Sequence, residues 1–469
     1  MPHVWPSVPA RTRRFRRVLA VLFMSTALFA TSEVGEAQEF QTGTFLFDTE
    51  LGATLQAYAK PILEAAGMRG DEVKIGMVVD DSINAVATPG KMIFFHTGLL
   101  LRAENANEVI GVMAHEVGHI SAGHVVIVAS DMAAPTAISL LSTLLGIAVG
   151  VVSGNPEAGM AVMMGGQRAA IGSYLSFSRG QEARADQFAL KVLNDTHQSA
   201  RGLRDFFERL AGEELLITDN QDPYVRSHPL NSDRRSAIEA AMATSPYTNA
   251  PLDPELARQH RRLKAKLFAF LKPQISTFQR YPSTDHSVEA RYARAIAYYR
   301  RGQFDQALPL IDGLITELPK DPYFWQIKGD MQLSRAKVED AIFAYREALK
   351  NLPEAPEILA ALAHAAVESG NPEYAGEAQD SLKRALLIDP EDSNAWDLLA
   401  RSYSQNDQPG LSAYAASERA ILLGQFGDVV RYSNQAEKLL EKGTPTWYRL
   451  QDIKILAQNY MRDMRNNRR

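Results

Sequence analysis

Residues 115–119 read His-Glu-Val-Gly-His, a spacing that could hold and use a metal ion. On an α-helix, residues four positions apart differ by about 40° around the axis and by about 6 Å along it. The imidazoles of His115 and His119 would therefore project from one face at a separation that suits a single ion. Glu116 would lie beside the first ligand, where its carboxylate can reach a water molecule at the metal without being a ligand itself. The pattern predicts a metal site with a carboxylate next to it.

A catalytic zinc site of this kind needs a third protein ligand and one open position. His124 is nearest in sequence, but it lies about 140° around the helix from His119, so we expect it to face away as a surface or packing histidine. Glu182 and Asp186 share a face, at positions i and i+4, near the start of a second predicted helix. Glu182 could bind the metal while Asp186 accepts the second N–H of a ligating imidazole. The residues alone leave open the alternative of a solvated acidic face.

Two helices and a small group of strands must position these side chains. The spacing of apolar residues predicts a helix from Glu104 to about His124 and a second from about Arg179 to Leu193. Short strands are predicted between Asp71 and Leu100, with Met92–Phe95 directly after a Pro-Gly turn. A further helix is predicted for Leu256–Leu271.

The stretch between the two helices is unusual because residues 132–156 contain no charged side chain. Residues 136–152 are apolar enough for a membrane helix. However, the stretch separates His119 from Glu182, which would have to meet at one metal ion. We therefore favour an apolar helical hairpin that covers the active-site cleft or contacts a hydrophobic partner. Insertion into a membrane, or peripheral contact with one through residues 136–152, is the alternative.

Three segments together closely resemble the M48 metallopeptidases. They are the His-Glu-Val-Gly-His motif, the segment Ser178-Arg-Gly-Gln-Glu-Ala-Arg-Ala-Asp186, and Ser82-Ile-Asn-Ala85 with Pro89–Leu100. The resemblance covers about residues 45–240. It implies a zincin-like helical metalloprotease domain with a small β-sheet, one Zn²⁺ bound by His115, His119 and Glu182, and Glu116 as the general base. The sequence departs from the family at His96, where Asn is common, and at Arg184, which replaces a frequent Glu.

A fourth segment, Ser227-His228-Pro229 followed by Arg234, matches a His-Pro…Arg segment of the same family. The resemblance makes His228 a candidate donor to the oxyanion of the tetrahedral intermediate. It also places Arg234 in the catalytic set. We further hypothesise that the imidazole of His228 can take the open position on the metal and hold the enzyme inactive. The alternative is a histidine that caps a loop.

The C-terminal part of the chain repeats itself. Prolines 319, 353 and 390 end similar segments, 34 and then 37 residues apart. Small and aromatic residues before Pro353 fall at the signature positions of a helix–turn–helix repeat, namely Trp325, Gly329, Ala341, Tyr345 and Ala348. This resembles the tetratricopeptide repeat. Because each helix pair leaves an apolar face that only its neighbour can cover, we expect a stacked α-solenoid. The third unit has about three extra residues, which predict a longer turn, and an ordinary helical bundle is the alternative.

The N-terminus is typical of a secretory signal peptide. A basic cluster at 11–17 precedes the uncharged apolar run 18–30, and small residues at 35 and 37 suit cleavage before Gln38. The run has 13 residues, which is short of the roughly 20 that span a bilayer as a helix. We therefore expect cleavage and a periplasmic location. An uncleaved membrane anchor is the alternative.

Composition limits the remaining possibilities. The chain has 469 residues, of which 46% are apolar and 22% charged, as in globular proteins of two or three domains. It has no cysteine, which excludes disulfides, thiolate ligands, cysteine nucleophiles and a lipidated N-terminal cysteine. Without residues 1–37 the 45 basic and 53 acidic residues give a net charge of −8. Because nucleic acid is itself strongly negative, we do not expect a chain with this net charge to bind it.

We therefore expect a signal peptide (1–37), a protease domain (38–250), a helical linker (251–282) and a tetratricopeptide-repeat domain (283–469). This combination resembles bacterial proteases of envelope quality control. The resemblance implies misassembled outer-membrane proteins as substrates, and repeats that recruit them, assist their assembly and contact the barrel-assembly machinery. The alternatives are a chaperone or interaction scaffold with a latent protease, and a membrane-embedded CaaX-type protease.

Overall fold

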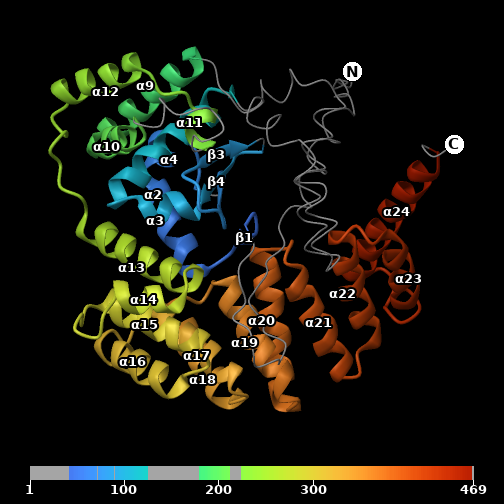
Figure 1. The fold of residues 1–469 in the computed structure, drawn as a ribbon. Helices are drawn as coiled ribbons and strands as arrows, with labels where there is room; N and C mark the ends of the chain where they lie inside the picture. The colour runs from blue at the N-terminus through green and yellow to red at the C-terminus, as the bar shows by residue number, and fades with distance from the viewer. Residues whose placement is uncertain (1–41, 71, 89, 125–178, 212–222, 467–469) are drawn as a thin grey trace, which may run out of the picture. The chain divides into compact units, whose positions relative to one another are not determined.

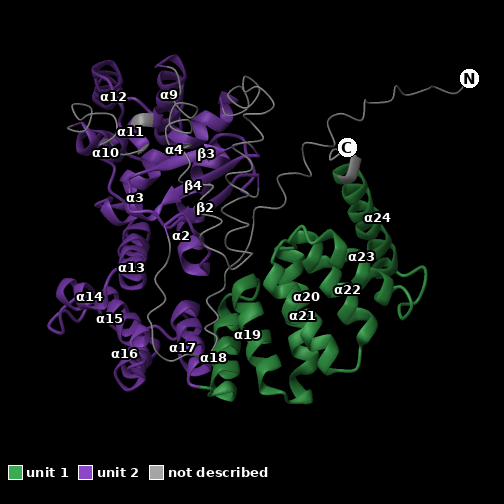
Figure 2. Cartoon of the chain, turned by 45° about the vertical axis from the view of Figure 1, so that its right-hand side comes forward, with its two compact units in different colours: residues 1–27, 151–154, 336–469 green, residues 28–150, 155–335 purple. Residues whose placement is uncertain are grey.

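The computed structural model describes residues 42–466, except for residues 71, 89, 125–178 and 212–222 (Figure 1). The described residues divide into two compact units, one that ends at Arg335 and one that begins at Ala336 (Figure 2). The first unit contains a small sheet, the helices around it and the first helices of the repeat region. The second unit contains the remaining repeat helices. The predicted fold class, mainly helical with a small β-sheet and followed by helical repeats, is confirmed.

The sheet has four strands in the order β1-β2-β4-β3. β2 is parallel to β4, whereas the pairs β1–β2 and β3–β4 are antiparallel, with Ala85 opposite Phe95. β3 is therefore an edge strand of the described sheet. The strands comprise Phe45–Leu46 (β1), Lys74–Val78 (β2), Ala85–Thr88 (β3) and Met92–His96 (β4).

The central helix of the first unit is α4 (Ala106–Ser121), and 13 of its 16 residues are buried. α2, α9 and α10 pack against it, and β3 crosses it on the side of the sheet (Figure 1). The other helices of this part are α3, α11 and α12. Their bounds are Thr49–Ala65 (α2), Thr97–Arg102 (α3), Arg179–Asp195 (α9), Arg201–Leu210 (α10), Pro223–Ser227 (α11) and Ser232–Thr244 (α12).

Two glycines of α4 explain how closely its neighbours approach. A Cβ atom at Gly111 would lie 2.8 Å from the backbone nitrogen of Leu203 in α10, and one at Gly118 would lie 3.0 Å from the carbonyl oxygen of Ala185 in α9. Any larger side chain at Gly118 would therefore push α9 away from α4. The glycine inside the His-Glu-Val-Gly-His motif thus sets the distance between the two helices that carry the predicted site residues.

α13 (Pro254–Leu271) joins the protease part to the first repeat helices of the same unit. Leu263 and Leu267 belong to the core beneath α4, whereas Ala265 and Ala269 belong to the core formed with α15. One helix therefore packs into both cores. It is followed by α14 (Gln274–Arg280), α15 (Val288–Arg300), α16 (Phe304–Glu317) and α17 (Pro322–Ser334).

A buried network of charges reinforces this junction. Glu50 at the start of α2 is 2.6 Å from Arg262 and 3.2 Å from Lys266, both on α13, and it accepts a 2.9 Å hydrogen bond from the hydroxyl of Tyr292 on α15. Arg262 also pairs with Asp321, which caps α17. Burial would raise the pKa of Glu50, but Arg262 and Lys266 outweigh it and lower the pKa. Four helices of the first unit are thus linked through side chains that are removed from water.

The second unit consists of paired repeat helices. Their bounds are Val338–Asn351 (α18), Pro356–Ser369 (α19), Ala375–Ile388 (α20), Ser393–Gln405 (α21), Pro409–Leu422 (α22), Phe426–Ala436 (α23) and Pro445–Asn466 (α24). The longer turn predicted in the third repeat contains a short 3₁₀ helix, η4 (Pro372–Tyr374).

The signature tryptophans make the same contact in two repeats. The indole N–H of Trp325 donates to the carbonyl of Pro319 at 2.9 Å, and that of Trp396 donates to the carbonyl of Pro390 at 3.0 Å. In both cases the bond ties the start of a repeat to the proline that ends the previous one. The 34-residue periodicity in the sequence therefore corresponds to a repeated local structure.

Several expectations concern segments outside the described residues. These are the signal peptide at 1–37 and the charge-free stretch 132–156, including residues 136–152. Within the part of the chain that the structure describes, every helix is too short or too polar to cross a bilayer.

The charge network predicts that replacing Arg262 lowers the free energy of unfolding much more than replacing its neighbour Arg261. Replacing Arg262 by Met should lower the free energy of unfolding by about 3–5 kcal/mol, because Glu50 and Asp321 would lose their buried partner. The deficit should shrink as the pH falls. An acid with a lowered pKa in the folded state contributes stability above its unfolded pKa and loses it as the pH falls through the folded value. Urea unfolding at several pH values would measure this.

The matched control is Arg261→Met. The Arg261 side chain is 61% exposed and pairs with Glu289, so this variant should differ from the parent by about 1 kcal/mol or less. Equal destabilisation by the two substitutions would contradict the importance of the buried network.

Candidate active site

The structure brings four potential ligands to one point. His115, His119, Glu182 and His228 each offer one donor atom, these atoms lie within 4.8 Å of one another, and all four residues are buried. The Nε2 atoms of His115 and His119 are 3.1 Å apart. His228 Nδ1 is 3.3 Å from His115 Nε2 and 3.1 Å from Glu182 Oε1, which is in turn 3.3 Å from His119 Nε2. We refer to these four residues as the metal cluster.

The spacing of the cluster fits a tetrahedral ion. Zinc binds imidazole nitrogen and carboxylate oxygen at about 2.0–2.1 Å, which gives a tetrahedron with edges of about 3.3 Å. Four of the six distances between donor atoms, from 3.1 to 3.3 Å, match those edges, and all four donor atoms lie within 4.8 Å of one another. The donor set of nitrogen and oxygen atoms also suits zinc. The residues present therefore fit one zinc ion in number, type and approximate spacing.

Asp186 and Arg234 orient the cluster from behind. Asp186 Oδ1 is 2.9 Å from His115 Nδ1, so this carboxylate orients the ring with Nε2 toward the cluster. Arg234 donates to both oxygens of Asp186, at 2.6 and 2.9 Å, and lies 2.8 Å from Glu182 Oε2. Arg234 is thus a buried cation that holds the carboxylates of Asp186 and Glu182 in place. The other carboxylate oxygen of Glu182, Oε1, faces the metal cluster.

The electrostatics of the cluster favour a bound cation. Burial alone would lower the pKa of His115, but hydrogen bonds to Asp186 and Glu182 raise it to about 10. Burial lowers the pKa of His119 to about 3, against the effect of Glu182. Burial would raise the pKa of Glu182, but the interactions with His228, His115 and His119 bring it well below its ordinary value. The negative field that retains a proton on His115 would equally attract a metal ion.

Glu116 lies on the same helix beside the cluster. Its Oε2 accepts a 3.0 Å hydrogen bond from the backbone N–H of Ala87 in β3, and its Oε1 is 3.5 Å from His228 Nε2. Burial raises the pKa of Glu116. A carboxylate with a raised pKa is a stronger base toward the proton of an attacking water than an ordinary glutamate, as a general base requires. The backbone N–H of Ala87 therefore helps to position the Glu116 carboxylate, and a backbone donor of this kind cannot be recognised from residue types.

The expectation that His124 faces away was wrong. α4 ends at Ser121, and Gly123 has a φ of +70°, so the chain turns back instead of continuing the helix. His124 is 1% exposed, with its Nδ1 at 3.1 Å from His119 Nδ1 and its Nε2 at 3.3 Å from Arg184 Nε. It packs behind the metal cluster and is not one of its members, so of the expected surface or packing histidine it is the packing kind. Arg184, one of the two departures from the family pattern, thus contacts it.

The other departure, His96, lies outside the metal cluster. At the end of β4, its Nδ1 is 2.9 Å from the hydroxyl of Ser82, which donates to Asp80 at 2.6 Å. Tyr224 of α11 was absent from the sequence-based set, although its ring stacks on His228. Its position four residues before His228 was the only signal in the sequence.

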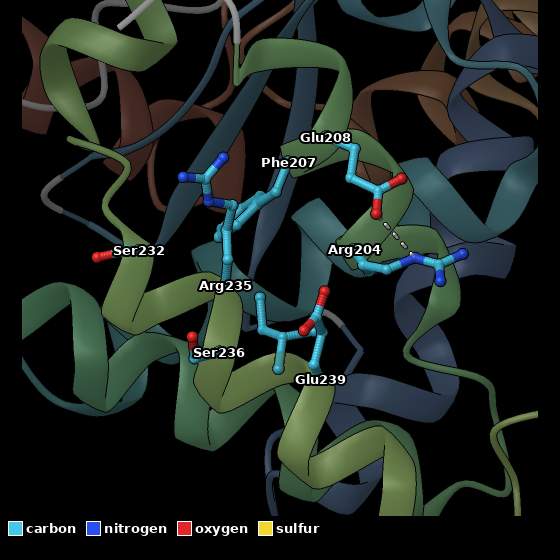
Figure 3. Close-up of a pocket in the computed structure, with 8 residues that line it drawn as sticks. Arg204, Phe207, Glu208, Ser232, Arg235, Ser236 and Glu239 are labelled. Atoms are coloured by element: carbon cyan, nitrogen blue, oxygen red, sulfur yellow. Dashed lines mark ion pairs between the residues drawn. The ribbon is translucent and has the colours of Figure 1, made fainter.

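A surface hollow of about 310 Å³ lies between α10 and α12 (Figure 3). Arg204 and Arg235 line it, and Arg204 pairs with Glu208 at 3.7 Å. Its wall includes Phe207, whose ring also lies 4.7 Å from the guanidinium of Arg234. The hollow contains none of the metal-cluster residues and is separate from the site described above.

Comparisons with known proteins agree with this geometry. The model of peptidase family M48 matches residues 50–242, and a tetratricopeptide-repeat model matches residues 332–402. The chain is accordingly a metalloprotease, with a protease part similar to a zinc-dependent family, joined to tetratricopeptide repeats.

Similar curated proteins match either most of this chain or a shorter part of it. A putative beta-barrel assembly-enhancing protease of Vibrio cholerae is 27% identical over 78% of this chain and 76% of its own length. The beta-barrel assembly-enhancing protease of Escherichia coli is 23% identical over 90% of this chain and 88% of its own length. The metalloprotease YcaL of Escherichia coli is 27% identical over 42% of this chain and 72% of its own length.

The contact between Asp186 and His115 predicts a specific effect on metal binding. Asp186→Asn should lower the affinity for zinc by about 10–100-fold, because an amide holds the imidazole in the required tautomer less well than a carboxylate. Competition with a chromophoric chelator would measure the dissociation constant. Asp195→Asn is the control on the same helix, since Asp195 is exposed and pairs with Lys191. Unchanged zinc affinity in Asp186→Asn would refute the orienting role.

Proposed function

We propose that this chain is a zinc-dependent endopeptidase of the bacterial periplasm that degrades misassembled outer-membrane β-barrel proteins. The observation that carries the proposal is the metal cluster with Glu116 beside it. The periplasmic location is supported by the signal-peptide pattern at 1–37. The substrate class is supported by the relatives, whose names refer to β-barrel assembly.

The repeats have a complementary role in this proposal. We assign residues 38–250 to the protease, 251–282 to a helical linker and 283–469 to a repeat domain that recruits clients and assists their assembly. A stack of helix pairs offers an extended surface that suits a peptide segment or a partner helix. The proposed partner is the barrel-assembly machinery. A role as a chaperone or scaffold is the second candidate, favoured by the presence of the repeats.

The chemistry follows from the placement of the side chains. A zinc ion held by His115, His119 and Glu182 would polarise the scissile carbonyl and make the attacking water more acidic. Glu116 would accept the proton of that water and later donate it to the leaving amine. Because the N–H of Ala87 holds one oxygen of Glu116, the carboxylate presents the other in a constant direction.

His228 would have two states in this mechanism. In the present structure its Nδ1 lies among the donor atoms of the cluster, so it can act as a fourth ligand that keeps water and substrate out. When it leaves that position, its ring N–H can donate to the oxyanion of the tetrahedral intermediate. Arg234 restrains the backbone next to it, since its guanidinium donates to the carbonyl of Pro229 at 2.9 Å.

Glu116→Gln tests the peptidase function. The variant should bind zinc as the parent does but lose peptide hydrolysis by a factor of about 10²–10⁴, because an amide cannot accept the proton of the attacking water. Hydrolysis of an unfolded outer-membrane protein by the purified chain, with and without a chelator, would measure this.

Glu104→Gln is the matched control, because the Glu104 side chain is 73% exposed. In cells, equal loss of the misassembled client in the parent and in Glu116→Gln would leave only the chaperone or scaffold role.

His228→Ala tests the proposed latch. Removing the fourth donor should weaken zinc binding and change basal proteolysis, because the open position is no longer blocked while the oxyanion loses a donor. Zinc competition and initial rates on a short peptide would report the two effects separately. Unchanged zinc affinity together with unchanged basal proteolysis would rule out the latch.

A further inference from the structure

Tyr224 makes an extensive contact with His228. Its ring is fully buried and stacks on the imidazole, with the ring centres 4.5 Å apart and an angle of 25° between the planes. In addition, the backbone N–H of His228 donates to the carbonyl oxygen of Tyr224 at 2.7 Å. His228 is therefore tied to Tyr224 through both its backbone and its ring.

Tyr224 is itself held by parts of the fold outside the metal cluster. Its backbone N–H donates to the carbonyl of Ile83 at 3.3 Å, two residues before the start of β3. Its ring meets Phe206 of α10 edge to face, at 5.2 Å and 85°. The sheet side and α10 thus fix Tyr224 independently of any ion.

His228 needs such support more than the other members of the cluster. His115 and His119 project from the buried helix α4, and Glu182 projects from α9, so regular backbone positions all three. His228 follows the five-residue helix α11, ahead of the N-cap of α12. Regular helical backbone therefore does not set the direction of its ring, and neighbouring side chains must do so. The stacked ring of Tyr224 restricts that direction.

The contact depends on the ring of Tyr224 and not on its hydroxyl. The hydroxyl oxygen is buried and has no hydrogen-bond partner among the described residues. Phenylalanine would therefore keep the stack, the edge-to-face contact with Phe206 and both backbone hydrogen bonds. Leucine would keep the backbone bonds but lose the flat surface against which the imidazole lies.

We propose that Tyr224 is a positioning residue that holds the imidazole of His228 among the donor atoms of the metal cluster. The inference rests on the proposed role of His228 as a fourth ligand and adds the residue that sets its position. Tyr224 acts chiefly through His228, because its ring stacks on that imidazole at 4.5 Å, whereas the ring centre of His115 is 6.5 Å away. Its effect on zinc binding should consequently disappear when His228 is absent.

The test compares zinc affinity, by chelator competition, in the full chain and its variants. Tyr224→Leu should weaken zinc binding by about 10-fold, in the range typical of groups that orient a metal ligand. Tyr224→Phe should stay within about twofold of the parent, because the ring is retained. In the His228→Ala background, adding Tyr224→Leu should change the affinity no further, as expected for two residues that act as a unit.

Tyr58→Leu is the control for simple loss of packing. Tyr58 is also fully buried and contacts a histidine, His260, but it is not part of the metal cluster. Tyr58→Leu should lower the thermal midpoint of unfolding, as Tyr224→Leu does, but it should leave the zinc affinity unchanged.

The outcomes separate the two proposals. If His228→Ala leaves zinc affinity unchanged, the fourth-ligand role of His228 fails and the Tyr224 proposal falls with it. If His228→Ala weakens binding but Tyr224→Leu does not, or if the two effects add in the double variant, only the positioning role of Tyr224 is wrong.

Discussion

The structure depends above all on the removal of several ionisable side chains from water at one point. Three imidazoles and the carboxylates of Glu116 and Glu182 are buried together, and Asp186 lies directly behind them. Burying such groups is costly unless opposite charge and hydrogen bonds compensate for the lost hydration. Arg234 neutralises the side away from the metal cluster, where it reaches Asp186 and one oxygen of Glu182. A metal cation would complete the compensation on the other side.

This compensation requires two helices to lie unusually close together. Glu182 is on α9 and the histidines are on α4, and Gly118 leaves room for the backbone of α9 at Ala185. The motif residue without a side chain is therefore as important to the geometry as the residues that bind. The same helix brings Glu116 against β3, so the sheet positions the base and α9 positions the third ligand.

The protease part and the first repeat helices form one unit because they share α13 and a buried charge network. Glu50, Arg262 and Lys266 are almost entirely buried, and Glu50 lies 2.6 Å from Arg262 and 3.2 Å from Lys266. Apolar packing alone would allow several similar arrangements of these helices, whereas unpaired buried charges make alternative arrangements costly. The network therefore specifies how the first repeat helices join the protease.

The sequence by itself determined the features that depend on local periodicity. The i, i+4 spacing of His115 and His119 is a property of any helix, and the signature residues of the repeats recur at a fixed period. The pairing of Glu182 with the histidines was also predictable, with Asp186 and Arg234, because a family resemblance spans their separation in the chain.

Tertiary structure decided what depends on contacts between distant segments or on a change of backbone direction. His124 returns to the back of His119 because Gly123 reverses the chain, which helical periodicity does not predict. Glu116 is held by the backbone N–H of Ala87, and the position of a backbone group cannot be predicted from a pattern of residue types. The stacking of Tyr224 on His228 and the partners of Glu50 depend on where short helices and loops come to lie, and long-range packing sets those positions.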